Sequence, residues 1–341
     1  MTCDPFITRF RCAVTSLLSP GTGLVVAVSG GADSMALLHG LVRSGLVQRH
    51  PCVVAHFDHA LRDTSADDAH FVTTQAALLH LTTHVERWQE PHAVGNLAQR
   101  ARQARYAFLA RVARHTGATA LLTGHQQDDQ AETFLERILR GSGVRGLGAM
   151  EPIRPLEPGT ESDILLVRPL LSFRRERLRQ WLQTHDLPWR DDPGNGDRRR
   201  LRSRLRHQLL PCLQAVNPDD DPVPRLAATA DRMQSADVAL EWIWQRVRHD
   251  LDIQSPEAGV MTLAHDQLAS LPTEIMRRAV VHCHAALTGD PFPPGARAMA
   301  GLFRHMQTNR ATWNMRMRGM TIQRVDDRLI LKKHLPGNLI L

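Results

Sequence analysis

The sequence predicts an α/β protein: a doubly wound parallel sheet, then a second, mainly helical domain that ends in a small β meander. Short apolar runs rich in β-branched residues alternate with helical stretches through the first two-thirds of the chain. Polar residues gather directly after several of these runs, where open parallel sheets place ligands. From about residue 225 long helices take over, and residues 312–317, 320–325 and 329–333 have the pattern of short strands.

The elements follow in order along two predicted domains, residues 1–216 and 217–341. An amphipathic helix begins the chain, buried strands are expected at residues 24–28, 52–57 and 118–123, and a further strand is expected at about residues 83–88. Helices are expected between them, the longest over residues 96–115. The segment 217–224 (NPDDDPVP) is acidic and rich in proline, which is typical of a connection between domains. A long amphipathic helix follows, and we expect its Trp242 and Trp244 in the core.

Composition restricts the partners. The chain of 341 residues is long enough for two cores, and its formal net charge of +7, mostly from arginine, favours a polyanionic partner. No apolar run reaches the roughly 18 residues of a membrane span, so no membrane partner is expected. Five scattered cysteines without a CxxC pair indicate a reducing, cytoplasmic location and no zinc or iron–sulfur site.

Residues 24–38 (LVVAVSGGADSMALL) are the most informative stretch. A strand runs into a tight turn and then a helix, so the turn amides and the helix dipole form a cradle for an anion. Asp33 would repel a phosphate there unless a cation lay between them, which predicts magnesium. A helix with a simple N-cap is the alternative, and the GK[ST] ending of a P-loop is lacking. The residues of the cradle are Ser29, Gly30, Gly31, Ala32, Asp33 and Ser34.

A second polar group follows the strand at residues 118–123. His125 comes directly after this strand, and Asp129 and Glu132 are three residues apart, on one face of the next helix. Two acids facing a cleft could hold an ammonium group or a metal ion. Acids that simply favour the start of a helix are the alternative, and His125 alone is also compatible with an ordinary loop histidine.

Two further segments stand out. Residues 198–206 contain six arginines, a run of like charge that favours contact with phosphates over a merely solvated helix face. Residues 140–148 (RGSGVRGLG) are rich in glycine and could be a flap over the site or a surface loop.

Five blocks in this order resemble the tRNA(Ile)-lysidine synthetases of the pyrophosphatase-loop family, which have an adenine-nucleotide-hydrolase-like fold. The resemblance covers about residues 24–213, is weaker beyond them, and suggests a short form of the family. The blocks are SGGADS (29–34), HFDHALR (56–62), ARQARY (101–106), TGHQQDDQAET (123–133) with RGSGVRGL (140–147), and RPLL (168–171) followed by DDPGN (191–195) and the arginine run.

The resemblance implies a reaction. ATP adenylates the C2 oxygen of the wobble cytidine in tRNA(Ile) with a CAU anticodon, and pyrophosphate leaves. The ε-amine of free L-lysine then displaces AMP and forms lysidine, which changes the codon read from AUG to AUA. ATP and Mg²⁺ are the implied cofactors, and a monomer and a homodimer both stay open.

The resemblance also assigns roles to residues of this chain. ATP would bind to the cradle, with Mg²⁺ at Asp33, and Arg105 and His125 would stabilise charge at the activated carbonyl. Lysine would bind to Asp129 and Glu132. The arginines expected to contact tRNA phosphates are Arg198, Arg202 and Arg206.

Three positions depart from the family's usual residues: Ala98 replaces a Glu, Gln126 a second His, and Ser203 an Asn. The alternative function is another pyrophosphatase-loop tRNA-modifying enzyme, such as a 2-thiocytidine synthetase. Those enzymes carry sulfur on cysteines or a cluster, and no cysteine pair flanks the motifs here. A tRNA-binding protein with an inactive nucleotide site is a third alternative, which ATP-dependent release of pyrophosphate would distinguish.

Overall fold

The chain forms two compact units, residues 1–234 and 235–341. The computed structural model describes residues 4–61, 65–89, 96–156, 163–191, 201–290, 292–308 and 310–334. The division between the units falls inside helix α10 (Pro222–Val247). The domain boundary predicted at residues 216–217 lies just before the same helix and stays a prediction.

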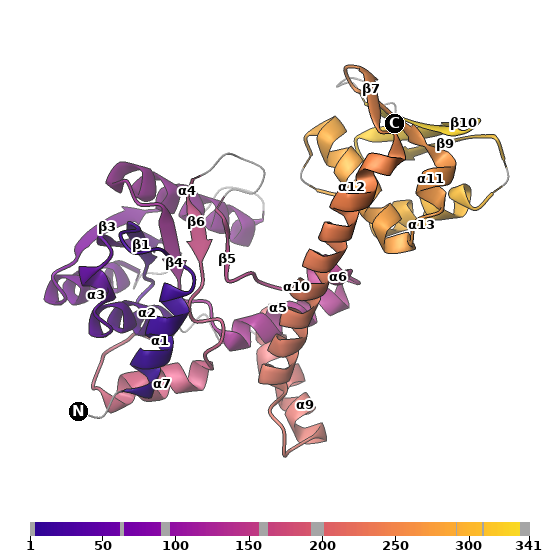
Figure 1. Ribbon diagram of the computed structural model, residues 1–341. Helices are drawn as coiled ribbons and strands as arrows, with labels where there is room; N and C mark the ends of the chain where they lie inside the picture. The colour runs from indigo at the N-terminus through magenta and orange to yellow at the C-terminus, as the bar shows by residue number, and fades with distance from the viewer. Residues whose placement is uncertain are drawn as a thin grey trace. The chain divides into compact units, whose positions relative to one another are not determined.

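The first unit contains a six-stranded sheet with the strand order β3-β2-β1-β4-β6-β5 (Figure 1). Every neighbouring pair is parallel except β5 and β6, which form an antiparallel hairpin. The predicted parallel sheet is therefore confirmed. The strands are β1 (Leu24–Ala27), β2 (Cys52–Asp58), β3 (Thr82–Arg87), β4 (Ala120–Thr123), β5 (Ile153–Pro155) and β6 (Leu165–Val167).

Helices cover both faces of this sheet. Leu24 and Val26 of β1 pack into a core with α1, α2, α3 and α7, whereas Val25 points into a second core with α4. Because both faces are covered, β1 is apolar at every position rather than alternating. The helices of this unit are α1 (Pro5–Thr15), α2 (Ala32–Arg43), η1 (Leu46–Gln48), α3 (Ser65–Leu78), α4 (Leu97–Thr116), α5 (Gln127–Leu139), α6 (Val144–Leu147), α7 (Arg175–Thr184), α8 (Leu201–Arg204), η3 (Leu205–Leu209) and α9 (Leu210–Val216).

The central strands bring the two predicted polar groups together. β1 lies between β2 and β4, so the chain leaves β1 toward one side of the sheet and returns later on the other side. Such a point opens a crevice at the carboxyl ends of the strands. Ala27 at the end of β1 pairs with Thr123 at the end of β4. A Cβ at Gly124 would lie 3.0 Å from backbone atoms of Asp33, so only glycine permits this close approach.

The second unit contains a five-stranded antiparallel sheet with the order β7-β8-β11-β10-β9. The predicted meander is confirmed as β9–β11. Sequence reasoning missed β7 and β8. β7 is exposed at all four positions and contains a proline, so it lacks the apolar pattern of a strand. The elements after α10 are η4 (Arg248–Leu251), β7 (Gln254–Glu257), β8 (Val260–Ala264), α11 (His265–Ala269), α12 (Thr273–Thr288), α13 (Ala296–Met306), β9 (Thr312–Met317), β10 (Met320–Val325) and β11 (Arg328–Lys333).

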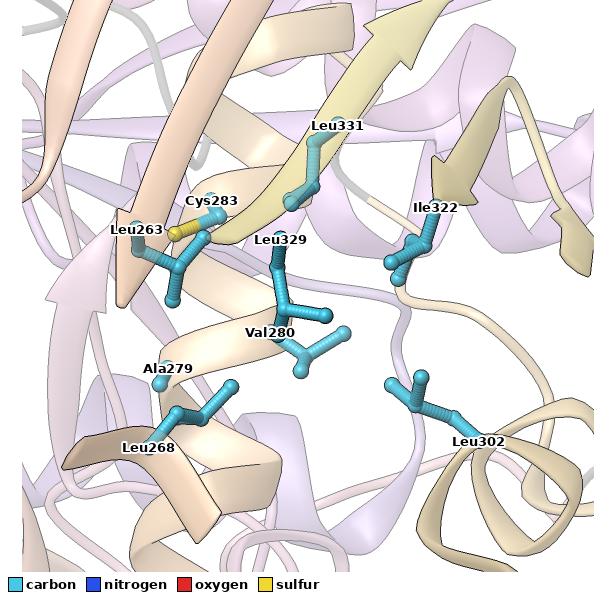
Figure 2. Close-up of a pocket in the computed structure, with 9 residues that line it drawn as sticks. All are labelled: Leu263, Leu268, Ala279, Val280, Cys283, Leu302, Ile322, Leu329 and Leu331. Atoms are coloured by element: carbon cyan, nitrogen blue, oxygen red, sulfur yellow. The ribbon is translucent and has the colours of Figure 1, made fainter. Parts of the chain in front are cut away.

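An apolar core joins this sheet to its helices. Figure 2 shows nine of its side chains, from α11, α12, α13 and strands β8, β10 and β11, around a gap of about 10 Å³. A gap of this size and lining is part of the core and not a ligand site. Trp244 is buried as predicted, but the prediction was wrong for Trp242, which is 59% exposed and has Arg246 over its ring.

Candidate active site

The turn after β1 has the geometry of an anion cradle. Gly30 has a φ of +88°, a conformation that favours glycine. Gly31 is the N-cap of α2 and has no side chain to occupy the amides of the first helical turn. The Ser34 hydroxyl accepts a hydrogen bond from the Ser29 amide at 3.1 Å and donates one to the Gly31 carbonyl at 2.9 Å. The Ser34 hydroxyl therefore stabilises the conformation of the cradle, and the backbone N–H groups supply the partial positive charge that an anion would contact.

Asp33 lies at the start of α2 and is poorly satisfied. Its Oδ1 atom is buried and has no hydrogen-bond partner among the described residues. Its Oδ2 atom accepts a long hydrogen bond of 3.4 Å from Gln126, and the Nε atom of Arg175 is 3.9 Å away. Burial and then the nearby Asp129 raise the pKa of Asp33 to about 6.

These features fit a divalent cation at Asp33. No group of three or more metal-binding side chains occurs among the described residues, so this part of the chain builds no cage for a metal on its own. Magnesium does not require one, because it commonly takes one or two carboxylates together with substrate phosphates and water. The unpartnered Oδ1 atom beside an anion cradle is the donor that such a site needs.

The acid pair is held at the start of α5. The side chain of Gln126 accepts from the amide of Asp129 at 3.3 Å, and the Asp129 carboxylate accepts from the amide of Gln126 at 3.1 Å, a capping box. Gln126 thus caps α5 and also reaches Asp33. Burial raises the pKa of Asp129, while Arg175 acts in the opposite direction. Glu132 is fully buried on the same helix.

His125 and Arg105 lie in a basic cluster at the same edge of the sheet. The Nδ1 atom of His125 is 2.8 Å from the Thr123 hydroxyl. Burial, followed by the charges of Arg168 and Arg105, lowers the pKa of His125 well below its usual value, so this imidazole is neutral at pH 7. The Nε atoms of Arg105 and Arg168 are buried and have no partner among the described residues. This cluster is suited to an incoming acceptor or anion.

The arginine run contacts the acid helix. Arg206 donates two hydrogen bonds to Glu132, at 2.7 and 3.1 Å, and Arg202 donates to the Thr133 hydroxyl at 2.7 Å. Arg204 is exposed and Ser203 is buried. Arg198 lies outside the described residues. The structure therefore brings Arg202 and Arg206 to the site, with the guanidinium of Arg206 already on a carboxylate.

Comparisons with known proteins show which family the chain belongs to. Residues 6–213 match the PP-loop domain family. A tRNA(Ile)-lysidine synthase of Methylobacterium nodulans is 38% identical over 274 residues, which are 80% of this chain and 78% of that protein. The chain belongs to the tRNA(Ile)-lysidine synthase family of PP-loop proteins.

Two other likenesses add detail. A tRNA(Ile)-lysidine synthase of Ruegeria pomeroyi is 38% identical over 82% of this chain, but the match covers 64% of that protein, slightly less than two-thirds of its length. The structure of a U34-tRNA thiolase from Methanococcus maripaludis superposes with a TM-score of 0.55 at 14% identity, over 67% of this chain and 78% of the thiolase. At that identity the likeness concerns the fold alone.

Arg175 is a residue of this candidate site to which sequence reasoning assigned no role. It is the first residue of α7, and its Nη2 atom is 3.4 Å from Asp129 Oδ1 and 3.4 Å from Glu132 Oε1. The available signal was the RPLL block (168–171), which ends shortly before this arginine. Several neighbouring arginines share that region, and the sequence does not distinguish the one that faces the acids.

None of the described helices has the length and apolar character needed to cross a membrane. The four described cysteines, Cys12, Cys52, Cys212 and Cys283, are free thiols, and none lies in the segments that form the site. Burial raises the pKa of Cys52 and of Cys283 to about 12, so neither is an activated nucleophile.

Proposed function

We propose that this protein is a tRNA(Ile)-lysidine synthase, a ligase that forms a carbon–nitrogen bond with ATP, L-lysine and tRNA(Ile) bearing a CAU anticodon. AMP and pyrophosphate are the other products, and the modified tRNA reads AUA instead of AUG. The observation that carries the proposal is the buried Asp33 oxygen, which has no partner among the described residues and lies in an anion cradle beside the acid pair Asp129 and Glu132. Membership of the lysidine synthase family supports it.

The first half-reaction needs alignment and charge neutralisation more than covalent chemistry. The amides of the turn at residues 29–34 would hold the pyrophosphate part of ATP, with the C2 oxygen of the cytidine in line with the α-phosphate. Mg²⁺, held by Asp33, would neutralise phosphate charge. Arg105 and the neutral His125 would donate hydrogen bonds to the α-phosphate oxygens, where negative charge is concentrated while pyrophosphate leaves.

The second half-reaction needs an unprotonated amine at C2. Asp129 and Glu132 would bind the ammonium group of lysine. Because burial raises the pKa of Asp129, its carboxylate is a better proton acceptor than an exposed one, and it would take the proton that the amine loses. The amine then attacks C2, the C–N bond forms, and the C–O bond to AMP breaks.

The tRNA must present an unstacked cytidine and its neighbouring phosphates. An anticodon loop permits unstacking at low cost. The arginine-rich chain and the exposed Arg202 and Arg204 suit the backbone of such a loop. The reaction would take place in the cytoplasm, where tRNA is modified and used.

The test is ATP–pyrophosphate exchange with purified protein and tRNA(Ile) bearing CAU, beside the same tRNA with uridine at the wobble position. We expect exchange only with the cytidine tRNA, and lysidine after labelled lysine is added. Exchange without incorporation of lysine would support the adenylation step but contradict lysine as the nucleophile that attacks the activated base. No exchange with either tRNA would contradict the proposal.

A further inference from the structure

The acid pair assigned to lysine already contacts a cation of the protein itself. The guanidinium of Arg175 bridges three carboxylates, with Nε toward Asp33 and Nη2 toward Asp129 and Glu132. An ammonium ion and this guanidinium cannot share the same carboxylate oxygens without strong repulsion. We propose that Arg175 holds the amine subsite until ATP binds, so that lysine enters only after the phosphates have drawn the guanidinium away. This inference rests on the proposed function.

The geometry distinguishes a movable arginine from a fixed one. Arg206 donates to Glu132 at 2.7 and 3.1 Å, the range of strong charge-assisted hydrogen bonds. The contacts of Arg175 with the three acids are all between 3.4 and 3.9 Å, too long for bonds of that strength. Arg206 therefore compensates the buried Glu132 permanently, whereas Arg175 is held loosely by the field of the three acids.

The backbone of Arg175 is anchored although its side chain is not. Its amide donates to the Asp128 carboxylate at 2.9 Å, and the Gln127 amide donates to the Phe173 carbonyl at 2.9 Å. These bonds pin the start of α7 to the start of α5. The guanidinium can then move by rotation of its own side chain, without displacement of either helix.

Charge gives the direction of the movement. Three carboxylates face two guanidinium groups, Arg175 and Arg206, in the described site. Binding of ATP with Mg²⁺ at Asp33 adds net negative charge on the side of the guanidinium that faces Asp33. Phosphate oxygens offer arginine paired hydrogen bonds, which are better than its present contacts. A guanidinium drawn to the phosphates frees the Asp129 carboxylate for the amine and leaves Glu132 with its bonds to Arg206.

The consequence is thermodynamic coupling between nucleotide and lysine. A ligand that removes the competing cation raises the affinity for lysine, and lysine must raise the affinity for the nucleotide by the same factor. The coupling also keeps the amine out of the site while no nucleotide is bound.

The experiment is equilibrium dialysis of labelled L-lysine against the full chain, alone and with Mg²⁺ and α,β-methylene-ATP, which cannot release pyrophosphate. For the unaltered protein we expect the nucleotide to tighten lysine binding at least tenfold. For Arg175→Gln we expect lysine affinities with and without nucleotide to agree within twofold, and the affinity without nucleotide to exceed that of the unaltered protein. Arg175→Lys keeps a cation in place and should retain most of the coupling.

Arg177→Gln is the matched control, because it removes the same charge from an exposed position on the same helix. It should keep the tenfold coupling. Nucleotide-independent lysine binding in the unaltered protein, or unchanged coupling in Arg175→Gln, would overturn the inference. If the unaltered protein makes lysidine but shows no coupling, only the role of Arg175 is wrong. If it neither binds nor incorporates lysine, the proposed function fails with it.

Discussion

Glu132 makes the most demanding prediction about the site, because it is completely buried and its carboxylate is paired with Arg206. Substitution of Glu132 by Gln preserves the shape and removes the charge that compensates Arg206. At an effective dielectric constant of about 20, two unit charges about 4 Å apart interact by about 4 kcal/mol. Arg206 is 26% exposed, and the amide oxygen of Gln can still accept one hydrogen bond, so about half of that energy should be lost.

We therefore expect Glu132→Gln to lower the free energy of unfolding by about 2 kcal/mol. For a unit of 150–250 residues this corresponds to a decrease in Tm of about 4–8 °C, measured by scanning calorimetry on the full chain. Glu136→Gln is the matched control on the same helix. Glu136 is 20% exposed and its partners Arg140 and Arg202 are 67% and 44% exposed, so the loss should stay below about 0.5 kcal/mol.

Equal shifts for the two variants would refute the reasoning, because the buried pair would then be no more important than a surface pair. A double variant, Glu132→Gln with Arg206→Gln, separates the pair from other effects. It should recover part of the stability that the single variant loses, since no unpaired guanidinium is left buried.

The remaining predictions concern chemistry, pH and tRNA. Asp33→Ala should lower ATP–pyrophosphate exchange at least about a thousandfold and leave tRNA affinity unchanged; loss of tRNA binding would contradict its role as a magnesium ligand. Asp129→Asn, which can still cap its helix, should raise the KM for lysine far more than the KM for ATP, and equal effects would argue against an amine site. Burial, and then Arg43, lower the pKa of His39 to about 4. Below about pH 6.5 His39 binds a proton in the unfolded protein but not in the folded one. The free energy of unfolding therefore falls as the pH decreases from 6.5 toward 4. Between pH 7.5 and 5, His39→Leu should therefore lose about 2 kcal/mol less than the unaltered protein in urea unfolding, whereas identical losses would contradict this origin of acid sensitivity. Substitution of Arg202 and Arg204 by Gln should weaken tRNA binding and reduce the slope of log K against log salt by about 1–2, and an unchanged slope would indicate a merely solvated face.

Local patterns in the sequence were sufficient for strands β1–β4 of the six-stranded sheet and for the parts of the site that lie on single elements. The cradle at residues 29–34 is formed by consecutive residues, so the strand, the glycines and the helix start are all visible in one stretch. The same holds for His125, Asp129 and Glu132, which follow one strand. The parallel order of β1 and β4 then brings both groups to one edge of the sheet.

Some predictions failed because a sequence pattern identifies an element but not the environment of each residue in it. Trp242 and Trp244 are two residues apart on α10, and positions with that spacing point to nearly opposite sides of a helix. One tryptophan therefore had to leave the core when the other entered it. β7 was missed because an exposed edge strand that contains a proline lacks the apolar pattern by which strands are recognised.

Only the tertiary structure decided which arginine forms an ion pair with which acid. Arg175 follows Asp129 by 46 residues and Arg206 follows Glu132 by 74, and several other arginines lie near each of them in sequence. Helical periodicity gives the face on which a side chain lies, but not the rotation and offset of α5, α7 and η3 against one another. Those are set by packing of their apolar sides, such as Leu135 of α5 against Leu205. The sequence by itself thus determined the anion cradle at residues 29–34 and the acids, and the packing of three helices determined the arginines that hold the acids.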